Sequence, residues 1–375
     1  MIPAANPLAD YLARKPEIDE AIQRVLSGGR YILGPEVAAF EEEFASFLGA
    51  DYAMGVGSGT EALHAALRVC GIGQGDRVIT VSHTAVATVA AIELAGAIPL
   101  LVDIDPKTYT LDANRLEDAL LAGQSTRIKA VIPVHLYGHP ADMSSIMRIA
   151  ERFDIRVIED CAQSHGASIG GRSVGTWGHL AAFSFYPTKN LGALGDGGAV
   201  VTNDPALAAR TALFREYGWK ERYISEMAGT NSRLDELQAA ILRIKLRFLE
   251  QDNGKRQEVA RRYDSMLSGS SLVLPRTQPG HTHVYHQYVI RTPHRDALKQ
   301  FLARSSVGSL IHYPVPIHLQ PAYRDGLLAP GGLPQTEQIC GEILSLPIHP
   351  HLTIDQVNRV GNAILSWLQQ DSQPR

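Results

Sequence analysis

Short apolar runs that alternate with helix-like segments constrain the fold of this chain more than any other feature of its sequence. The runs lie at residues 78–81, 98–102, 130–134, 157–158, 181–185 and 199–202. Several are apolar at every position, which is typical of strands buried on both faces of a mostly parallel sheet. Segments such as 84–94 and 142–153 have the spacing of the helices between them. The alternation predicts an α/β fold.

The flanking segments extend this pattern to two domains. Residues 1–50 have the spacing of amphipathic helices, and residues 231–265 read as one long helix. Beyond it we expect a strand at 284–290, a helix at 295–303, a strand at 309–312 and a last helix at 353–368. We therefore expect a large domain over residues 1–250 and a small C-terminal α+β domain over residues 251–375.

Bulk properties exclude several classes of function. The formal net charge of -4 argues against a general attraction to nucleic acid or to an anionic membrane. No run reaches the ~18 apolar residues of a membrane span, and the first residues lack the pattern of a signal peptide. Cys70, Cys161 and Cys340 lie far apart, without a disulfide framework or a CxxC spacing. We expect a cytoplasmic protein with no membrane or nucleic-acid partner.

The first of four candidate motifs is the glycine-rich turn Gly57-Ser58-Gly59-Thr60, which precedes a helix. Backbone N–H groups and the positive end of the helix dipole at such a turn suit a phosphate group. Taken alone, the turn is better explained as a helix cap with glycines that allow the chain to bend.

The second motif ends an apolar run with Glu159 and Asp160, and Gln163 follows. Ligands of open α/β sheets lie at the carboxyl ends of strands, where Asp160 could pair with a protonated ring nitrogen. Because side chains alternate along a strand, Glu159 should point to the other face. An aspartate that only caps the next turn explains the motif equally well.

The third motif places Lys189 after an apolar run and before the glycine-rich stretch 192–198. Small residues let a planar cofactor approach closely, and a lysine amine kept neutral by its surroundings can form a Schiff base. Ser184, on the preceding run, suits a phosphate oxygen. An ordinary solvated lysine remains the alternative.

The fourth motif begins with Asn231 and continues to Gln238, with acidic residues at 235 and 236 that helix capping alone explains. In their order, the four motifs and the segment 31–35 resemble the aminotransferases that act on nucleotide-linked keto-sugars. These aminotransferases, known as the DegT/DnrJ/EryC1/StrS type, are a family within the fold-type I pyridoxal-phosphate enzymes. The resemblance covers nearly the whole chain and implies a large domain with a mostly parallel mixed sheet.

The resemblance implies a role for each matching residue. Lys189 would carry pyridoxal 5′-phosphate covalently and shuttle protons, while Asp160 would keep the ring nitrogen of the cofactor protonated. His83 stands where family members place an aromatic ring over the cofactor. Asn231 would reach the cofactor phosphate of the neighbouring subunit, which implies a homodimer. The remaining cofactor contacts would come from Gly59, Thr60, Gln163 and Ser184.

The resemblance also implies the reaction, in which an amino donor, usually L-glutamate, gives its amino group to a keto-sugar in two half-reactions. Related dehydrating enzymes have histidine in place of the lysine, so Lys189 favours transamination. The stretches 82–88, 189–196 and 217–223 are similar to the subgroup that aminates C3 of dTDP-linked 3-keto-6-deoxyhexoses. Substrate contacts would come from Tyr186, Lys220, Arg222, His312, Tyr313 and His318, of which the last three are equally well explained by packing.

Three alternatives stay open. They are a C4 aminotransferase on a dTDP- or UDP-linked 4-keto-sugar, a cyclitol or aminohydroxybenzoate-pathway enzyme with the same cofactor, and a regulatory protein that has lost turnover. The presence of Lys189, Asp160, Gln163 and Ser184 together argues against the last.

A run of three histidines, His281, His283 and His286, suggests a metal site. Neither an acidic residue nor a cysteine has ligand spacing around it, so we interpret the run as a solvent-facing turn before a strand and expect no metal.

Overall fold

A seven-stranded mixed sheet forms the centre of the computed structural model, which describes residues 1–122, 127–324 and 326–371. The strand order is β1-β9-β8-β5-β4-β2-β3. The strands are β1 (Tyr52–Val56), β2 (Arg77–Val81), β3 (Ile98–Val102), β4 (Ile128–Val131), β5 (Arg156–Asp160), β8 (Leu180–Ser184) and β9 (Gly198–Thr202). Within this sheet β9 is antiparallel to both of its neighbours, and the other pairs are parallel. The predicted α/β fold is confirmed.

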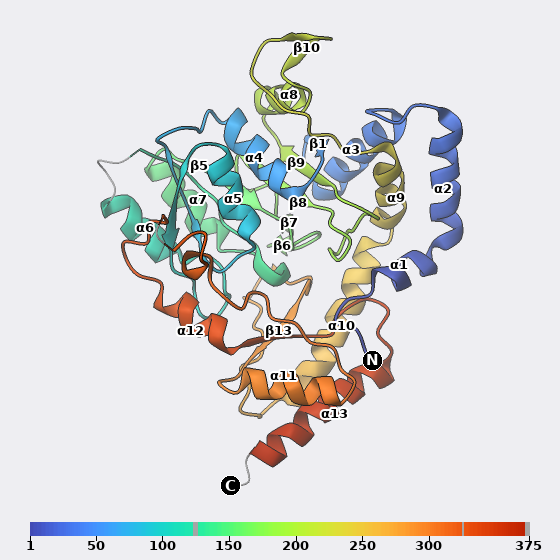
Figure 1. Ribbon diagram of the computed structural model, residues 1–375, viewed down its shortest axis with the longest axis vertical. Helices are drawn as coiled ribbons and strands as arrows, with labels where there is room; N and C mark the ends of the chain where they lie inside the picture. The colour runs from blue at the N-terminus through green and yellow to red at the C-terminus, as the bar shows by residue number, and fades with distance from the viewer. Residues whose placement is uncertain (123–126, 325, 372–375) are drawn as a thin grey trace.

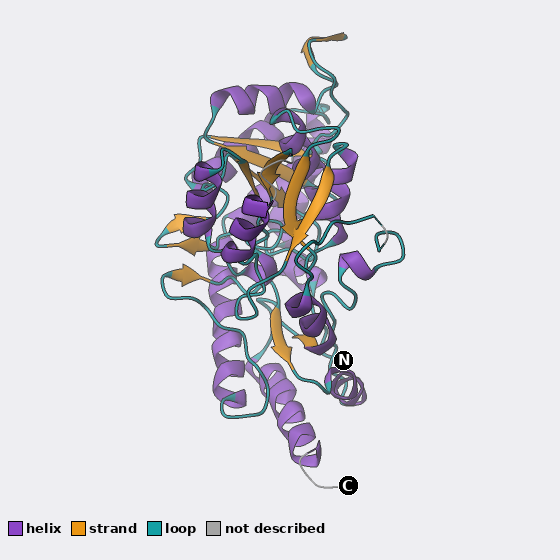
Figure 2. Cartoon of the chain, turned by 90° about the vertical axis from the view of Figure 1, so that its left-hand side faces the viewer, coloured by secondary structure: helices purple, strands orange, loops and turns teal. Residues whose placement is uncertain are grey.

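Helices cover both faces of this sheet (Figures 1 and 2). One face packs against α4 (Gly59–Val69), α5 (Val86–Leu94) and α8 (Pro205–Phe214). The other packs against α3 (Pro35–Leu48), α6 (Ala113–Ala122), α7 (Met143–Arg152) and α9 (Glu236–Leu246). Val157 and Ile158 show why the runs lack alternation, because these neighbours on β5 enter opposite apolar cores and both are fully buried.

A second apolar core lies below the sheet in Figure 1, around α10, α11 and α13. Its elements are α10 (Leu249–Leu267), α11 (Arg295–Arg304), α13 (Ile354–Asp371) and the antiparallel pair β13 (Tyr288–Arg291) and β14 (Ile343–Leu346). Ile2 is buried in this core, and its backbone bonds to Ser306 and Gly308. From the same half of the chain, α12 (Pro334–Glu342) packs back on the large sheet, where Asp103 accepts from the N–H of Thr336. The domain boundary at residue 250 stays a prediction.

The remaining elements are short or peripheral. They are α1 (Pro7–Ala13), α2 (Lys15–Gly28), the 3-10 turns η1 (Leu136–Gly138) and η2 (Ile317–Leu319), the sheet of β6 (Ser168–Ile169), β7 (Arg172–Ser173) and β12 (His281–Thr282), and the hairpin of β10 (Trp219–Glu221) and β11 (Ile224–Ser225). The hairpin projects from the top of the molecule (Figure 1). Within the described part of the chain, every helix is too short or too polar to cross a membrane.

The prediction of one helix over residues 231–265 is wrong. Residues 231–235 are not helical, with bridges from Asn231 to Glu216 and from Asp235 to Ile32, and the helical part is divided into α9 and α10. At the division Phe248 donates to Lys245, three residues back, which tightens the turn and redirects the chain. The predicted strand at 309–312 is reduced to a single bridge between Leu310 and Ser345.

Candidate active site

A cavity of about 260 Å³ opens at the carboxyl ends of β2, β5 and β8 and beside the first turn of α4. Its position follows from the topology, since the loops after parallel strands meet at one edge of the sheet. It brings together many of the predicted residues, and small side chains from the loop after β2 complete its wall. The lining includes Gly59, Thr60, Thr84, Ala85, Ala87, Asp160, Gln163, Ser184, Tyr186, Lys189 and Asp196.

The first turn of α4 and the end of β8 form one corner of this cavity. Ser58 caps the helix by accepting from the N–H of Glu61 over 3.2 Å. A Cβ atom on Gly59 would lie 2.6 Å from Cβ of Ser184, so the close approach of helix and strand requires glycine here. The corner therefore combines helix N–H groups with the Ser184 hydroxyl, which are donors for a phosphate group.

Asp160 lies at the end of β5 with both carboxylate oxygens engaged. One oxygen accepts from the hydroxyl of Thr88 over 2.9 Å, and the other accepts from the N–H of Ala162 over 3.1 Å. Burial raises the pKa of Asp160, while these two hydrogen bonds and the nearby Lys189 lower it. Thr88 lies in the stretch 82–88, where only His83 was predicted to contact the cofactor, and a threonine in the first turn of α5 is the signal that was missed.

Lys189 follows β8 and faces Asp160. Burial of its amine lowers the pKa of Lys189 to about 8, and the Asp160 carboxylate opposes this change. The amine is thus far easier to deprotonate than that of a solvated lysine. Lys245 supports the following loop by donating to the carbonyl oxygen of Gly192 over 2.7 Å.

Gln163 is held from two sides. Its Oε1 accepts from the N–H of Tyr137 over 2.7 Å, and its Nε2 donates to the hydroxyl of Tyr313 over 3.1 Å. Tyr137 lies outside every motif that we singled out, and no sequence signal marks it. His312, next to Tyr313, has its Nδ1 2.8 Å from Oγ of Ser345.

The three predicted histidines, His83, His312 and His318, are not among the residues that line the cavity. His83 is buried with one nitrogen near Cys340 and the other near the Tyr137 hydroxyl, and Ala85 takes a place in the cavity wall. A stacking position for His83 would require its ring to leave both partners. His318 has its Nδ1 2.7 Å from Oγ of Ser82 and its Nε2 3.2 Å from Glu337.

Asn231, Lys220 and Arg222 lie away from the cavity of their own chain. Lys220 pairs with Glu226 at 2.8 Å, and the guanidinium of Arg222 lies 5.0 Å from the ring centroid of Tyr223. Asn231 is exposed and accepts from Nε of Arg233 over 2.8 Å. All three belong to the projecting hairpin or to its base (Figure 1).

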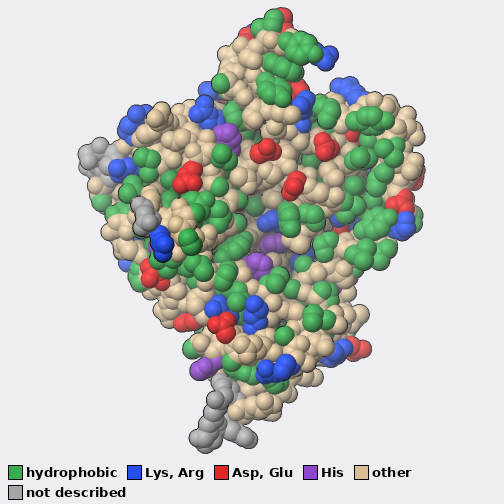
Figure 3. Space-filling view, in the orientation of Figure 1, with side chains coloured by type: hydrophobic (Ala, Val, Ile, Leu, Met, Phe, Trp, Pro, Cys, Tyr) green, Lys and Arg blue, Asp and Glu red, His purple; other side chains and the backbone are tan. Residues whose placement is uncertain are grey.

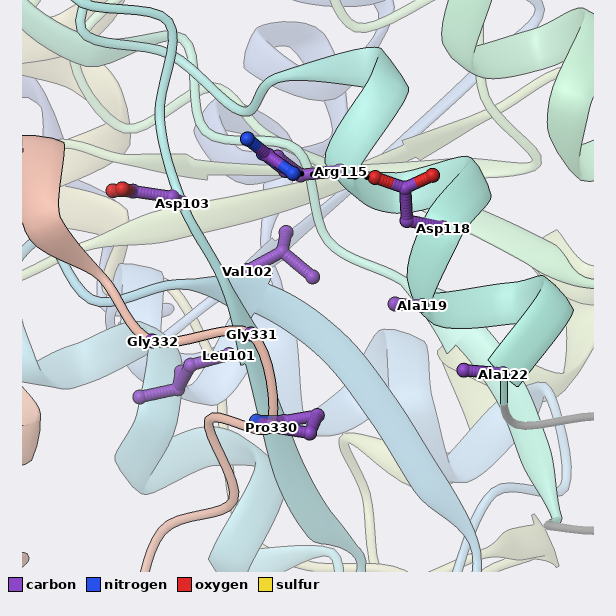
Figure 4. A pocket seen from close by; sticks show the side chains of 10 residues that line it. All are labelled: Leu101, Val102, Asp103, Arg115, Asp118, Ala119, Ala122, Pro330, Gly331 and Gly332. Carbon is purple, nitrogen blue, oxygen red and sulfur yellow. Dashed lines mark hydrogen bonds and ion pairs between the residues drawn. The ribbon is translucent and has the colours of Figure 1, made fainter.

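A second cavity, of about 230 Å³, lies between β3, α6 and residues 330–332 (Figure 4). Its walls are mostly apolar, and the exposed pair Arg115 and Asp118 lies at α6. Asp103 contributes to this cavity, but its carboxylate accepts from Gln335 and Thr336 at the start of α12. Among the described residues, its lining includes neither a lysine nor a histidine, whereas the first cavity gathers Lys189, Asp160 and Ser184, so the first cavity is the candidate site.

The histidines of the 281–286 run lie in a different environment from the one predicted. The interpretation of the 281–286 run as a solvent-facing turn is wrong, because His283 and His286 are buried. Nδ1 of His283 accepts from the N–H of Tyr285, whereas His286 contacts Asn190. In another cluster, His135 lies 3.0 Å from Glu159, close to Cys161.

Glu159 points to the face of β5 opposite Asp160, as expected. Its two oxygens also accept from the backbone N–H groups of Gly175, Trp177 and Gly178. Because these bonds occupy its lone pairs, the carboxylate stabilises the loop after β7.

These residues fit pyridoxal 5′-phosphate. The corner at Gly59 and Ser184 supplies phosphate donors, Asp160 supplies a carboxylate for a protonated ring nitrogen, and Lys189 supplies an amine with a lowered pKa. The close contact of Gly59 with Ser184 is the feature least expected of a simple helix cap.

Comparison with known proteins agrees with this chemistry. A transaminase from Streptomyces venezuelae, named for dTDP-3-amino-3,4,6-trideoxy-α-D-glucose, is 46% identical over 99% of this chain and 97% of its own length. DesV of S. venezuelae, solved in complex with a ketimine intermediate, has 46% identity and a TM-score of 0.95, covering 100% of this chain and 99% of DesV. NtdA of Bacillus subtilis, solved with the bound cofactor PMP, has 30% identity and a TM-score of 0.88. The match covers 96% of this chain and 82% of NtdA.

The family comparison extends over most of the chain. Residues 13–365 match the model of the DegT/DnrJ/EryC1/StrS aminotransferase family. Pyridoxal phosphate is the cofactor of these fold-type I aminotransferases, and the predicted fold class, enzyme class and cofactor are confirmed. The chain belongs to the DegT/DnrJ/EryC1/StrS aminotransferase family.

Proposed function

We propose that this aminotransferase moves an amino group from L-glutamate to C3 of a dTDP-linked 3-keto-6-deoxyhexose. The observation that carries the proposal is the cavity shared by Lys189, Asp160, Ser184 and the first turn of α4. It gathers an amine, a carboxylate and phosphate donors in one space. The C3 position is supported by the name of the Streptomyces relative and by the stretches 82–88, 189–196 and 217–223.

Pyridoxal phosphate, when bound, supplies an electron sink for the carbon atom that loses a proton. In the proposed site, Gly59, Thr60 and Ser184 hold its phosphate, Gln163 lies beside its ring and Lys189 is its covalent attachment. Asp160 holds the proton on its ring nitrogen. The hydrogen bonds of Thr88 and Ala162 to Asp160 favour the charged carboxylate that this role needs.

Lys189 is the proposed proton carrier. Because burial lowers the pKa of Lys189 to about 8, about a tenth of the amine is neutral at neutral pH, far more than for a solvated lysine. The neutral amine accepts a proton from the carbon that bears the amino group of the donor. In its ammonium form, Lys189 returns a proton during the second half-reaction.

The proposed active unit is a homodimer in which the hairpin of each subunit completes the site of the other. Tyr223 and Ile224, on the hairpin, are 72% and 59% exposed, and Figure 3 shows apolar side chains gathered there. Such side chains gain free energy when another surface covers them. Lys220 and Arg222 are then the partners of the substrate diphosphate, and Asn231 reaches the cofactor phosphate of the other subunit.

The remaining assignments complete the proposal. Tyr186 and Tyr313 contact the sugar, and His312 and His318 support the loop from which Tyr313 extends. We place the large cofactor-binding domain in residues 1–250 and the small C-terminal domain in residues 251–375. A cytoplasmic setting is supported by the unpaired thiols of Cys70, Cys161 and Cys340.

An absorbance titration of the holoenzyme tests the function. L-Glutamate should remove the visible band of the bound cofactor, and dTDP-3-keto-6-deoxyglucose should restore it. The 4-keto isomer and a keto-cyclitol serve as comparison substrates. Restoration by either of these and not by the 3-keto-sugar contradicts the proposed substrate, and the absence of a band in wild type contradicts the cofactor site.

A further inference from the structure

Hydrogen bonds connect Cys340 on α12 to Gln163 in the cavity through two buried side chains. Sγ of Cys340 lies 3.2 Å from Nδ1 of His83, and Nε2 of His83 lies 2.8 Å from the hydroxyl of Tyr137. The backbone N–H of Tyr137 then donates to Oε1 of Gln163 over 2.7 Å. Of these residues, Gln163 is the one that lines the cavity.

The direction of each bond follows from what each atom can donate. The Tyr137 hydroxyl donates its single hydrogen to the carbonyl oxygen of His312, which can only accept. Nε2 of His83 must therefore carry the hydrogen that it shares with Tyr137. Burial lowers the pKa of His83 to about 4, so the ring is neutral and Nδ1 is left to accept from the thiol of Cys340.

Tyr137 is in an unusual backbone conformation that its contacts maintain. Its φ is +60°, in the left-handed region that side chains with a Cβ rarely adopt. Its hydroxyl is anchored by His83 and His312, and its ring packs edge-on against the rings of His83 and Tyr109. Since the same residue presents its N–H to Gln163, the side-chain anchor fixes where that N–H points.

We propose that His83 is a positioning residue, which donates to Tyr137 and thereby sets the orientation of the Gln163 amide in the cavity. With Oε1 held by Tyr137, the amide nitrogen of Gln163 is the donor that faces Tyr313 and the cavity. This inference rests on the proposed function, in which Gln163 lies beside the cofactor ring. It gives His83 a role through Tyr137 and not as a stacking ring.

Two substitutions at His83 separate these roles. His83→Phe keeps a ring and removes the donor, whereas His83→Gln removes the ring and keeps an N–H near the Nε2 position. A donor to a cofactor oxygen stabilises its deprotonated form, so misplacing Gln163 should raise the pH midpoint of the visible spectrum. We expect His83→Phe to raise this midpoint by about one unit and to weaken cofactor binding about tenfold. In His83→Gln the pH midpoint and the cofactor affinity should both stay close to those of wild type.

Matched variants test whether His83 acts on Gln163 through Tyr137. Tyr137→Phe should shift the midpoint as His83→Phe does, and the double variant should shift it no further. Tyr109→Phe removes a hydroxyl from the same aromatic cluster and should leave the pH midpoint of the visible spectrum as in wild type. Additive shifts, or a larger effect of His83→Gln than of His83→Phe, would overturn the proposal.

Hydrogen exchange of the apoprotein gives a readout that does not depend on the cofactor. His83→Phe should speed exchange of the Tyr137 amide about tenfold relative to wild type. In His83→Gln the exchange should be close to the wild-type rate. Unchanged exchange in His83→Phe would refute the positioning role even where the wild-type enzyme binds cofactor normally. If wild type lacks the cofactor band, the proposed function fails, and the exchange result still decides the role of His83.

Discussion

The hydroxyl of Thr88 lies 2.9 Å from a carboxylate oxygen of Asp160 and ties the first turn of α5 to the end of β5. Both side chains are buried, so no solvent donor replaces Thr88 when its hydroxyl is removed. The charge on Asp160 thus depends on a residue from another strand-helix unit.

Thr88→Val should raise the pKa of Asp160 further, because the charged form loses a donor while burial continues to disfavour it. The acidic limb of the pH–rate profile should move to higher pH, and kcat at neutral pH should fall roughly tenfold. Thr88→Ser keeps the hydroxyl and should behave like wild type. An unchanged acidic limb in Thr88→Val would contradict the coupling.

Lys189→Ala should abolish product formation and the visible band of the bound cofactor, and normal turnover would refute the assignment. The wild-type apoprotein offers a test of the lowered pKa of Lys189. Only the neutral amine captures the cofactor, so the rate of capture should rise with pH and level off above about 8. Stopped-flow absorbance measures this rate, and a midpoint near that of a solvated lysine would contradict the effect of burial.

Mixed dimers test whether Asn231 acts across the interface. Asn231→Ala and Lys189→Ala homodimers should each be nearly inactive. After denaturation and refolding of an equal mixture, half of the dimers carry one intact site, which should restore about a quarter of the wild-type activity. If both residues serve the same chain's site, mixing restores nothing. Size-exclusion chromatography checks that both variants form the proposed dimer.

Glu236 should be important for stability and not for chemistry. It is buried on α9 and accepts from the N–H groups of Gly34, Glu36 and Val37 at the start of α3, at 2.7–3.0 Å. Glu236→Ala leaves these donors without an acceptor and should lower the free energy of unfolding by roughly 3 kcal/mol in urea titrations. Glu250→Ala, at an exposed position of α10, serves as the control and should change it little.

The sequence predicts the central sheet well because burial on both faces leaves a local mark. The runs at 78–81 and 98–102 lie on strands, the run at 181–185 overlaps β8, and Thr353 and Gln356 form the predicted capping box. Two-residue strands such as β6 and β12 leave no such mark, since their pairing depends on segments more than a hundred residues apart. The turn between α9 and α10 is equally hidden, because both helices contain good helix formers.

The residues of the candidate site also divide into those that a local sequence pattern predicts and those that it does not. Asp160, Ser184 and Lys189 were predicted because strand ends and glycine-rich loops have a local pattern, and they share one cavity. The family resemblance placed His83 where an aromatic ring lies over the cofactor. Its orientation is decided instead by Tyr137 and Cys340, which come from distant parts of the chain. A motif fixes the backbone position of a residue, whereas the surrounding core decides where its side chain points.

The burial of Ile2 in the second core has a consequence for synthesis. All strands of the central sheet are complete once residue 202 has left the ribosome, so the sheet can assemble early. Ile2 packs with residues such as Val307 and Leu346, which are translated much later. The segment around Ile2 must therefore stay unburied until these residues have been made, and chaperones can reach it during that time.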